Sequence, residues 1–225
     1  MKAVIFGASG MEGQGVLREC IASTEVTNVL VVGRSASAID NPKVKDLVLE
    51  DLFDYSTVAA ELTGYDACFF CLGVSAAGMT EAEYTRITHD LTIAAAKALL
   101  AANPQMTFIY VSGQGTDETE KGRGMWARVK GRTENAILNM GFPHSYMFRP
   151  GLIQPMNGIK SKTPAYRFAY IVLWPFMPLL KVLFPRSITT TERVGKAMIR
   201  VAATKPDQRY VHNQDMNELA KLSLK

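Results

Sequence analysis

The chain alternates between short apolar runs and longer stretches in which apolar residues recur at helical spacing. The runs are almost continuously apolar, as in residues 29–32 (VLVV) and 67–70 (ACFF), which is typical of parallel strands covered on both faces. The predicted strands are residues 2–6, 28–32, 45–49, 66–71, 106–112, 144–148 and 208–212. The predicted helices are residues 11–22, 56–63, 80–102, 125–140 and 190–203. This alternation predicts the α/β class, with a Rossmann-type, doubly wound parallel sheet inside a three-layer αβα sandwich.

The only long departure from the alternation is the stretch 154–189. Because 225 residues suffice for one sizeable core, we predict a single domain over residues 1–225. Within it, residues 154–189 are expected to form a small C-terminal cap that covers a substrate or a partner. Capping boxes mark the expected starts of two helices, pairing Thr80 with Glu83 and Thr189 with Glu192.

The first strand runs into the first helix through the sequence VIFGASGMEGQG, which holds three evenly spaced glycines. Glycines permit a tight turn and a close approach of the backbone to a pyrophosphate, and the helix N–H groups that follow can face the phosphates. The spacing alone is a weak signal, but a strand before it and a helix after it are the required setting. The turn therefore predicts a dinucleotide site, formed here by Gly7, Ser9, Gly10, Met11 and Gly13.

The end of the second strand indicates which dinucleotide is bound. An Asp or Glu at this place would bind the ribose 2′-hydroxyl of NAD. The sequence has Gly33, Arg34 and Ser35 here and offers no carboxylate. An arginine can pair with a 2′-phosphate through its planar guanidinium. We therefore predict NADP(H), contacted by Arg34 and Ser35, in preference to NAD; the alternative is a solvated arginine at a strand end.

Five further stretches fall into register with the later strands and helices. They are EDLFD with Asp51 and Leu52, CFFCLGVS with Cys71, Leu72 and Gly73, YVSGQG with Ser112, MWARVKGRTE with Trp126 and Lys130, and FRPG with Pro150 and Gly151. Together they resemble the short-chain dehydrogenase/reductase superfamily, in its atypical and extended, epimerase-like NAD(P)-binding branch. Within that branch the chain is similar to the oxidoreductase group that includes the Tat-interacting protein. The resemblance implies that all these strand-end residues border the cofactor, with Asp51 and Leu52 beside the adenine.

In that superfamily a serine, a tyrosine and a lysine act together, with the spacing Tyr-x-x-x-Lys. Ser112 and Lys130 match the serine and the lysine, but Trp126 stands in the place of the tyrosine. An indole N–H only donates a hydrogen bond and cannot relay a proton. The resemblance implies that Lys130 binds the nicotinamide ribose and Ser112 polarises a carbonyl, unless both are retained for structural reasons. Other proton donors of no preferred spacing are Tyr84, Tyr110, Tyr146, Tyr166 and His144.

These features favour an NADPH-dependent reductase that acts on an unidentified small molecule. A flat, conjugated acceptor such as a flavin or quinone suits a site without the tyrosine, because it can take its proton from water. The first alternative is a catalytically weak or inactive NADP(H)-binding regulatory or sensor protein. An epimerase or dehydratase acting on a nucleotide sugar is a poorer alternative, since it needs the same tyrosine as a base.

Several other classes of site are disfavoured by the sequence. The net charge of +4 is spread without basic runs, so no nucleic-acid partner is indicated. Cys68 and Cys71 have redox spacing, but residues three apart in a strand point to opposite faces. The two histidines His89 and His212 form no spaced set with other ligands, so we expect no metal site.

The apolar segment 167–186 is too short and too interrupted by proline to span a membrane. We expect a pair of short helices that cover a pocket or a dimer face, with contact to a membrane surface as the disfavoured alternative. The chain begins directly on a predicted strand, with no charged region before a long apolar one, so we expect a cytoplasmic protein without a signal peptide. Both a monomer and a homodimer remain open.

Overall fold

The computed structural model describes residues 1–159 and 187–222. Its main sheet has seven strands, all parallel, in the order β3-β2-β1-β4-β5-β6-β9. These strands are β1 (Lys2–Phe6), β2 (Asn28–Gly33), β3 (Val44–Val48), β4 (Ala67–Phe70), β5 (Thr107–Val111), β6 (His144–Arg149) and β9 (Tyr210–His212). A second, two-stranded sheet joins β7 (Leu152–Gln154) to β8 (Ile188–Thr190). The predicted α/β fold with a doubly wound parallel sheet is confirmed.

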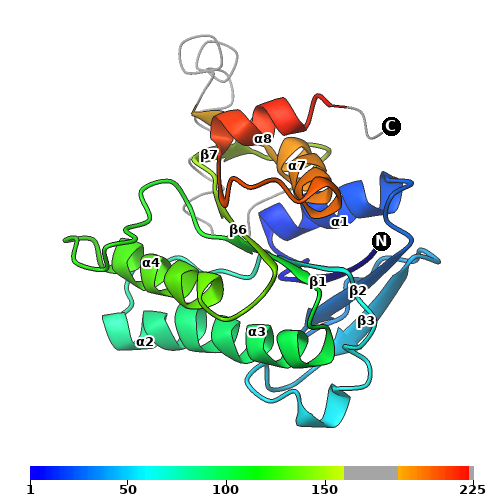
Figure 1. Ribbon diagram of the computed structural model, residues 1–225, viewed down its shortest axis with the longest axis horizontal. Helices are drawn as coiled ribbons and strands as arrows, with labels where there is room; N and C mark the ends of the chain where they lie inside the picture. The colour runs from blue at the N-terminus through cyan, green and yellow to red at the C-terminus, as the bar shows by residue number, and fades with distance from the viewer. Residues whose placement is uncertain (160–186, 223–225) are drawn as a thin grey trace.

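Helices cover both faces of the main sheet, which gives the three layers seen in Figure 1. One face carries α1 (Met11–Ala22), α7 (Thr191–Thr204) and α8 (Asn213–Leu219). The other face carries the 3-10 turn η1 (Ser56–Val58), α2 (Glu81–Thr85), the π-helical turn η2 (Arg86–Asp90), α3 (Leu91–Ala102) and α4 (Met125–Leu138). The strand order reverses between β1 and β4, because the chain crosses after β3 to the other side of β1. In sheets of this kind the ligand crevice lies at that reversal, beyond the carboxyl ends of the strands.

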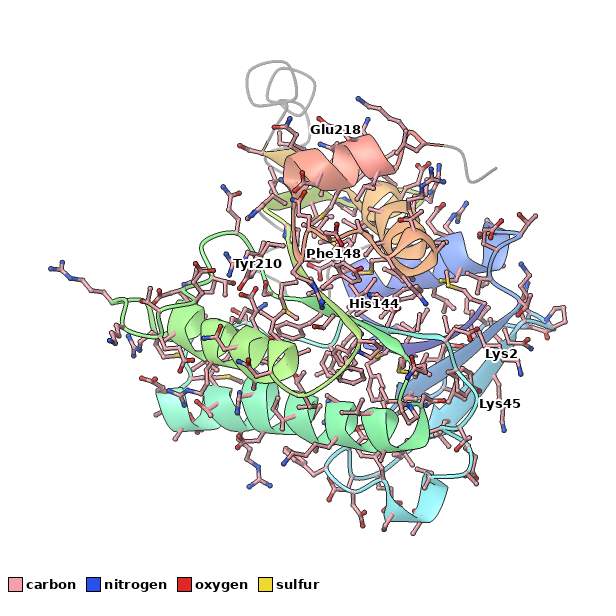
Figure 2. All side chains as sticks on the ribbon, in the orientation of Figure 1. Lys2, Lys45, His144, Phe148, Tyr210 and Glu218 are labelled. Carbon is pink, nitrogen blue, oxygen red and sulfur yellow. The ribbon has the colours of Figure 1, made fainter. Side chains whose placement is uncertain are left out.

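Each face of the sheet buries its own apolar cluster, because successive side chains of a strand point to opposite faces. Ile109 and Phe148 belong to the cluster under α1, α7 and α8, whereas Phe108 belongs to the cluster under α3 and α4. Figure 2 shows the side chains filling the space between sheet and helices, with Phe148 below α7 and α8. Cys68 and Cys71 fall into different clusters, and both thiols are free. The prediction that these sulfurs do not meet is confirmed.

The predicted elements need four corrections. The helix expected at 56–63 is only the turn η1, and the helix expected at 80–102 is interrupted by the π-turn η2. The chain also forms β7, β8 and α8, which we did not predict. Most of the predicted cap at 154–189, including the whole apolar segment 167–186, lies outside the described residues.

The fourth correction concerns the start of α7. The predicted capping box of Thr80 with Glu83 is present, but that of Thr189 with Glu192 is wrong. The side chain of Thr190 caps the helix instead, accepting a hydrogen bond from the backbone of Arg193 at 3.1 Å. Thr189 lies in β8 and points into the interior.

Candidate dinucleotide-binding site

The glycine turn joins β1 to α1 at the carboxyl edge of the sheet and packs against the end of β4. Gly7 has a φ of +78°, and a Cβ atom there would lie 2.6 Å from the backbone nitrogen of Leu72. A Cβ atom at Gly13 would overlap the carbonyl oxygen of Gly7. Both positions therefore require glycine, one for its backbone conformation and both for close approach.

The N-terminus of α1 is open to a ligand. Its N-cap residue is Gly10, which offers no side-chain hydrogen bond to the helix, while the backbone N–H of Gly10 donates to Gly7 at 2.9 Å. The first N–H groups of α1 have no partner within the helix. Of the other predicted residues of this turn, Ser9 is exposed and Met11 is partly buried against the core. The uncapped helix and the turn that only glycine can form fit the diphosphate of a dinucleotide.

The residues predicted to bind the adenosine half follow β2 and β3. Arg34 and Ser35 come directly after Gly33 and are exposed. None of the ion pairs among the described residues involves Arg34. Asp51 accepts a hydrogen bond from the backbone of Phe53 at 2.8 Å within its own loop, and Leu52 is buried in the core. The guanidinium of Arg34 is therefore free to meet an anion at this corner.

The remaining predicted cofactor residues follow β4 and β6. Cys71 donates its backbone N–H to Phe6 at 3.0 Å, which holds the segment Cys71-Leu72-Gly73 beside the glycine turn. Pro150 and Gly151 lie on the far side of β5: the carbonyl of Pro150 accepts from the backbone of Gln114 at 2.8 Å, and the N–H of Gly151 donates to Asn213 Oδ1 at 3.0 Å. The structure thus places Cys71, Leu72 and Gly73 beside the glycine turn. It links Pro150 and Gly151 to the loop after β5 and to α8.

Ser112 does not stand free at the end of β5. Its hydroxyl is buried and donates to Glu134 Oε1 at 2.5 Å, with the carbonyl oxygen of Phe148 at 3.2 Å as a second acceptor. Glu134 is itself fully buried and receives two hydrogen bonds from Arg149, one from Nε at 3.0 Å and one from an Nη at 2.5 Å. The expectation that Ser112 polarises a substrate carbonyl needs correction for this structure, because its proton is already engaged by a carboxylate.

The buried ion pair of Glu134 and Arg149 was not predicted from the sequence. Its signal was the position of Glu134, four residues after Lys130 and therefore on the same face of α4. Arg149 carries no comparable signal, since it directly follows the predicted strand 144–148, where a solvated charge is expected. Its side chain is only 12% exposed, and its guanidinium lies 4.3 Å from the centre of the Tyr210 ring.

Lys130 and Trp126 lie on the same α4 as Glu134. The ammonium of Lys130 donates to the backbone carbonyl of Ser112. Burial lowers the pKa of Lys130, while the nearby carboxylates of Glu12 and Glu134 act in the opposite direction. Trp126 is 39% exposed, and its indole lies beside Gly115. The lysine is thus held against the end of β5, and the indole four residues earlier on α4 is open to solvent.

The alternative proton donors are not placed to replace the tyrosine. Tyr84 and Tyr110 are fully buried, and burial raises the pKa of Tyr110. The hydroxyl of Tyr146 donates to the carbonyl of Pro206 at 2.8 Å. His144 begins β6, at the opposite edge of the sheet. Tyr166 lies outside the described residues.

Residues 1–159 and 187–222 contain neither a metal-binding cluster nor a membrane-spanning helix. No group of three or more His, Cys, Asp or Glu side chains there is arranged to hold a metal ion. No helix in the same ranges has the length and apolar character needed to cross a bilayer.

The chain has clear relatives among known proteins. A family model described as NAD(P)H-binding matches residues 7–143. Over 167 residues the chain is 30% identical to protein fmp52-2, mitochondrial, of Aspergillus terreus, an overlap of 73% of this chain and 71% of that protein. Other relatives with the Fmp52 name, from Emericella nidulans, Scheffersomyces stipitis and Meyerozyma guilliermondii, are also named mitochondrial.

These relatives overturn the prediction of a cytoplasmic protein. Their printed names place them in mitochondria, and nothing in the comparison supports the cytoplasm. The prediction was wrong because it took a chain that begins on a strand as a sign of its compartment. A strand at that place is required by the fold in any compartment.

Solved structures share the same architecture. Gre2 of Candida albicans in complex with NADPH superposes with a TM-score of 0.70 at 14% identity, covering 94% of this chain and 77% of that one. The enzyme WbmF of Bordetella bronchiseptica in complex with NAD+ gives a TM-score of 0.68 at 14% identity, covering 98% and 76%. These solved structures share the fold that the resemblance to the short-chain dehydrogenase/reductase superfamily implies, and the family model confirms the expected NAD(P)-binding domain. With the glycine turn, the uncapped α1 and the matched family model all in agreement, the chain belongs to the NAD(P)H-binding family.

Proposed function

We propose that this protein is an NADPH-dependent oxidoreductase that reduces a flat, conjugated acceptor. The observation that carries the proposal is the pairing of an uncapped helix N-terminus over the glycine turn with the free guanidinium of Arg34 at the end of β2. The first suits a diphosphate and the second suits the 2′-phosphate that distinguishes NADP from NAD. When bound, NADPH would supply two electrons as a hydride.

The residues around the crevice favour an acceptor that needs little help from a tyrosine. Lys130 offers an ammonium to the hydroxyls of a ribose, a role that needs only its charge and donors. Trp126 offers its exposed indole for stacking against a flat ring. Ser112 holds Glu134 and is not counted as a substrate contact. Flavins and quinones are acceptors of the matching shape.

The test is oxidation of NADPH by the purified full chain in the presence of a panel of acceptors, followed at the absorbance of reduced nicotinamide. We expect turnover with at least one flavin or quinone and little with simple ketones. NADPH binding without oxidation above background across the panel would contradict the reductase proposal. That same result would favour the second candidate below.

Replacing Arg34 with serine should weaken NADPH binding by about 10–100-fold, since charge-assisted hydrogen bonds contribute about 1.5–3 kcal/mol. Binding of NADH should stay nearly unchanged, because it lacks the 2′-phosphate. Isothermal titration calorimetry with both nucleotides measures the difference. Lys45→Ser, which removes one positive charge from β3, is the control and should leave both affinities in place. If Arg34→Ser weakened the binding of NADPH and NADH equally, the guanidinium of Arg34 would not be the group that binds the 2′-phosphate.

A second candidate is an NADP(H)-binding regulatory or sensor protein without significant turnover. It is favoured by one observation, that the hydroxyl of Ser112 is committed to a buried carboxylate while Trp126 cannot relay a proton. An epimerase or dehydratase is a weaker candidate for the same reason, since it depends on the missing tyrosine base.

We also propose that the protein works in mitochondria. The support is the shared mitochondrial naming of several Fmp52 relatives. Fractionation of cells that produce the full-length protein tests this, and recovery in the soluble cytosolic fraction alone would contradict it.

A further inference from the structure

Glu12 is an acidic residue near the candidate dinucleotide site that has no role in the function proposed above. It is the second residue of α1 and lies within the glycine turn, between Gly10 and Gly13. Its side chain is partly buried. The ammonium of Lys130 on α4 lies close enough to act on the pKa of Glu12, although the two form no ion pair within 4 Å among the described residues, and the carboxyl of Glu12 in turn acts on the thiol of Cys71 after β4. Burial raises the pKa of Glu12, and Lys130 only partly offsets this.

Glu12 differs from the other carboxyl beside Lys130. Glu134 has both oxygens engaged, by Arg149 and by the hydroxyl of Ser112. The ammonium of Lys130 donates a hydrogen bond to the backbone carbonyl of Ser112. No hydrogen bond among the described residues engages the carboxyl of Glu12. Of the two carboxyls that act on the pKa of Lys130, Glu134 is fixed in the interior, whereas Glu12 is partly buried and engaged by no hydrogen bond among the described residues.

Binding of a dinucleotide would change the protonation equilibrium of the Glu12 carboxyl group. Its diphosphate belongs at the N-terminus of α1, so two negative charges would come to lie beside this first-turn carboxyl. A like charge nearby disfavours the ionised form of an acid. Binding would therefore be coupled to uptake of a proton by Glu12, and the neutral carboxylic acid that results would lie within the electrostatic reach of Lys130.

We propose that Glu12 takes up a proton when the dinucleotide binds and donates it to the acceptor, filling the place that Trp126 leaves open. The inference rests on the proposed reductase function. The acceptor gains a hydride from NADPH, which leaves as NADP+, and a proton from the carboxyl of Glu12. Glu12 is left as a carboxylate beside the ammonium of Lys130 and regains its proton from water. Positioned acids of this kind contribute about 10²–10⁴-fold to a rate.

The first experiment measures protons and needs no turnover. NADPH is titrated into the full chain by calorimetry in buffers of different ionisation enthalpy, at several pH values. We expect uptake of up to one proton in the wild type, and an affinity that falls as the pH rises by up to about tenfold per unit, the limit for one linked proton. In Glu12→Gln the uptake assigned to this carboxyl should vanish. The 2′-phosphate titrates in both proteins, so the difference between them reports Glu12.

Two further variants make the comparison sharp. Glu12→Asp keeps a carboxyl group and should retain the uptake. Glu61→Gln, which removes an exposed carboxyl beyond η1, should behave as the wild type. Tight NADPH binding with the same proton uptake in the wild type and in Glu12→Gln would overturn the inference and leave the proposed function standing. Absence of NADPH binding to the wild type would overturn both.

The second experiment uses the acceptor identified in the panel. Glu12→Gln should lower kcat by about 10²–10⁴-fold and flatten its dependence on pH, whereas Glu12→Asp should keep a falling rate as the pH rises. A merely structural role for Glu12 would lower the stability of the variant without changing the shape of the pH profile. An unchanged kcat in Glu12→Gln would overturn the proton-donor role.

Discussion

Replacing Glu134 with alanine is expected to destabilise the protein by about 3–5 kcal/mol, the usual cost of breaking a buried ion pair from one side. The side chain of Glu134 is 0% exposed and that of Arg149 is 12% exposed. The substitution would leave the guanidinium of Arg149 in the interior without its bidentate partner and would remove the acceptor of the Ser112 hydroxyl. For a chain of this length, the loss corresponds to a fall in Tm of roughly 6–20 °C.

Glu118 provides a control on the same arginine. Its carboxylate also contacts Arg149, at 3.2 Å, but its side chain is 55% exposed. Exposed pairs contribute about 0–1 kcal/mol, so Glu118→Ala should change the free energy of unfolding by less than about 1 kcal/mol. Chemical denaturation of both variants gives the comparison. Similar losses of unfolding free energy in Glu134→Ala and Glu118→Ala would mean that burial does not determine how much each ion pair with Arg149 stabilises the protein.

The fold was predictable because its information is local. Each central strand is a short apolar run buried on both faces, as in the run that became β4, and the glycine turn stands where one strand meets one helix. Predictions failed where neighbouring residues of the same type could play the same structural role, as at the N-cap of α7. Three threonines in a row span the start of α7, and only the structure shows that Thr190 faces the free N–H of Arg193 while Thr189 points inward.

The candidate site was predictable only in part, because some of its contacts join distant segments. Glu134 and Arg149 become partners only when α4 packs over β5 and β6, and a single sequence gives no sign of that packing. The same holds for Glu12. The sequence predicts an ordinary acidic residue in the first turn of a helix, and only the structure shows that Lys130 of α4 lies close enough to influence its pKa. The helix α8 was missed because it is one short stretch whose start is fixed by the backbone N–H of His212 donating to Asp215 at 2.8 Å.

Replacing Gly13 with alanine should weaken dinucleotide binding by at least about 100-fold, or roughly 2.7 kcal/mol. A Cβ atom there would overlap the carbonyl oxygen of Gly7 and lie 2.9 Å from the Cα atom of Ala8. Both contacts are with backbone, so the turn or the first residues of α1 must move. Either shift misplaces N–H groups whose charge-assisted hydrogen bonds to phosphate contribute about 1.5–3 kcal/mol each.

Gly10→Ala is the graded control, since it lies in the same turn but is less crowded. Its nearest neighbour is the carbonyl oxygen of Gly7 at 3.3 Å, and its φ of −79° is open to alanine. We expect a loss of affinity well below that of Gly13→Ala. Calorimetric titration with NADPH, after circular dichroism has shown both variants to be folded, ranks them. Comparable affinities in the two variants, or tight binding by Gly13→Ala, would mean that the diphosphate does not rest on this turn. The crevice at the reversal of the sheet would then have to bind its nucleotide through the ends of the other strands alone.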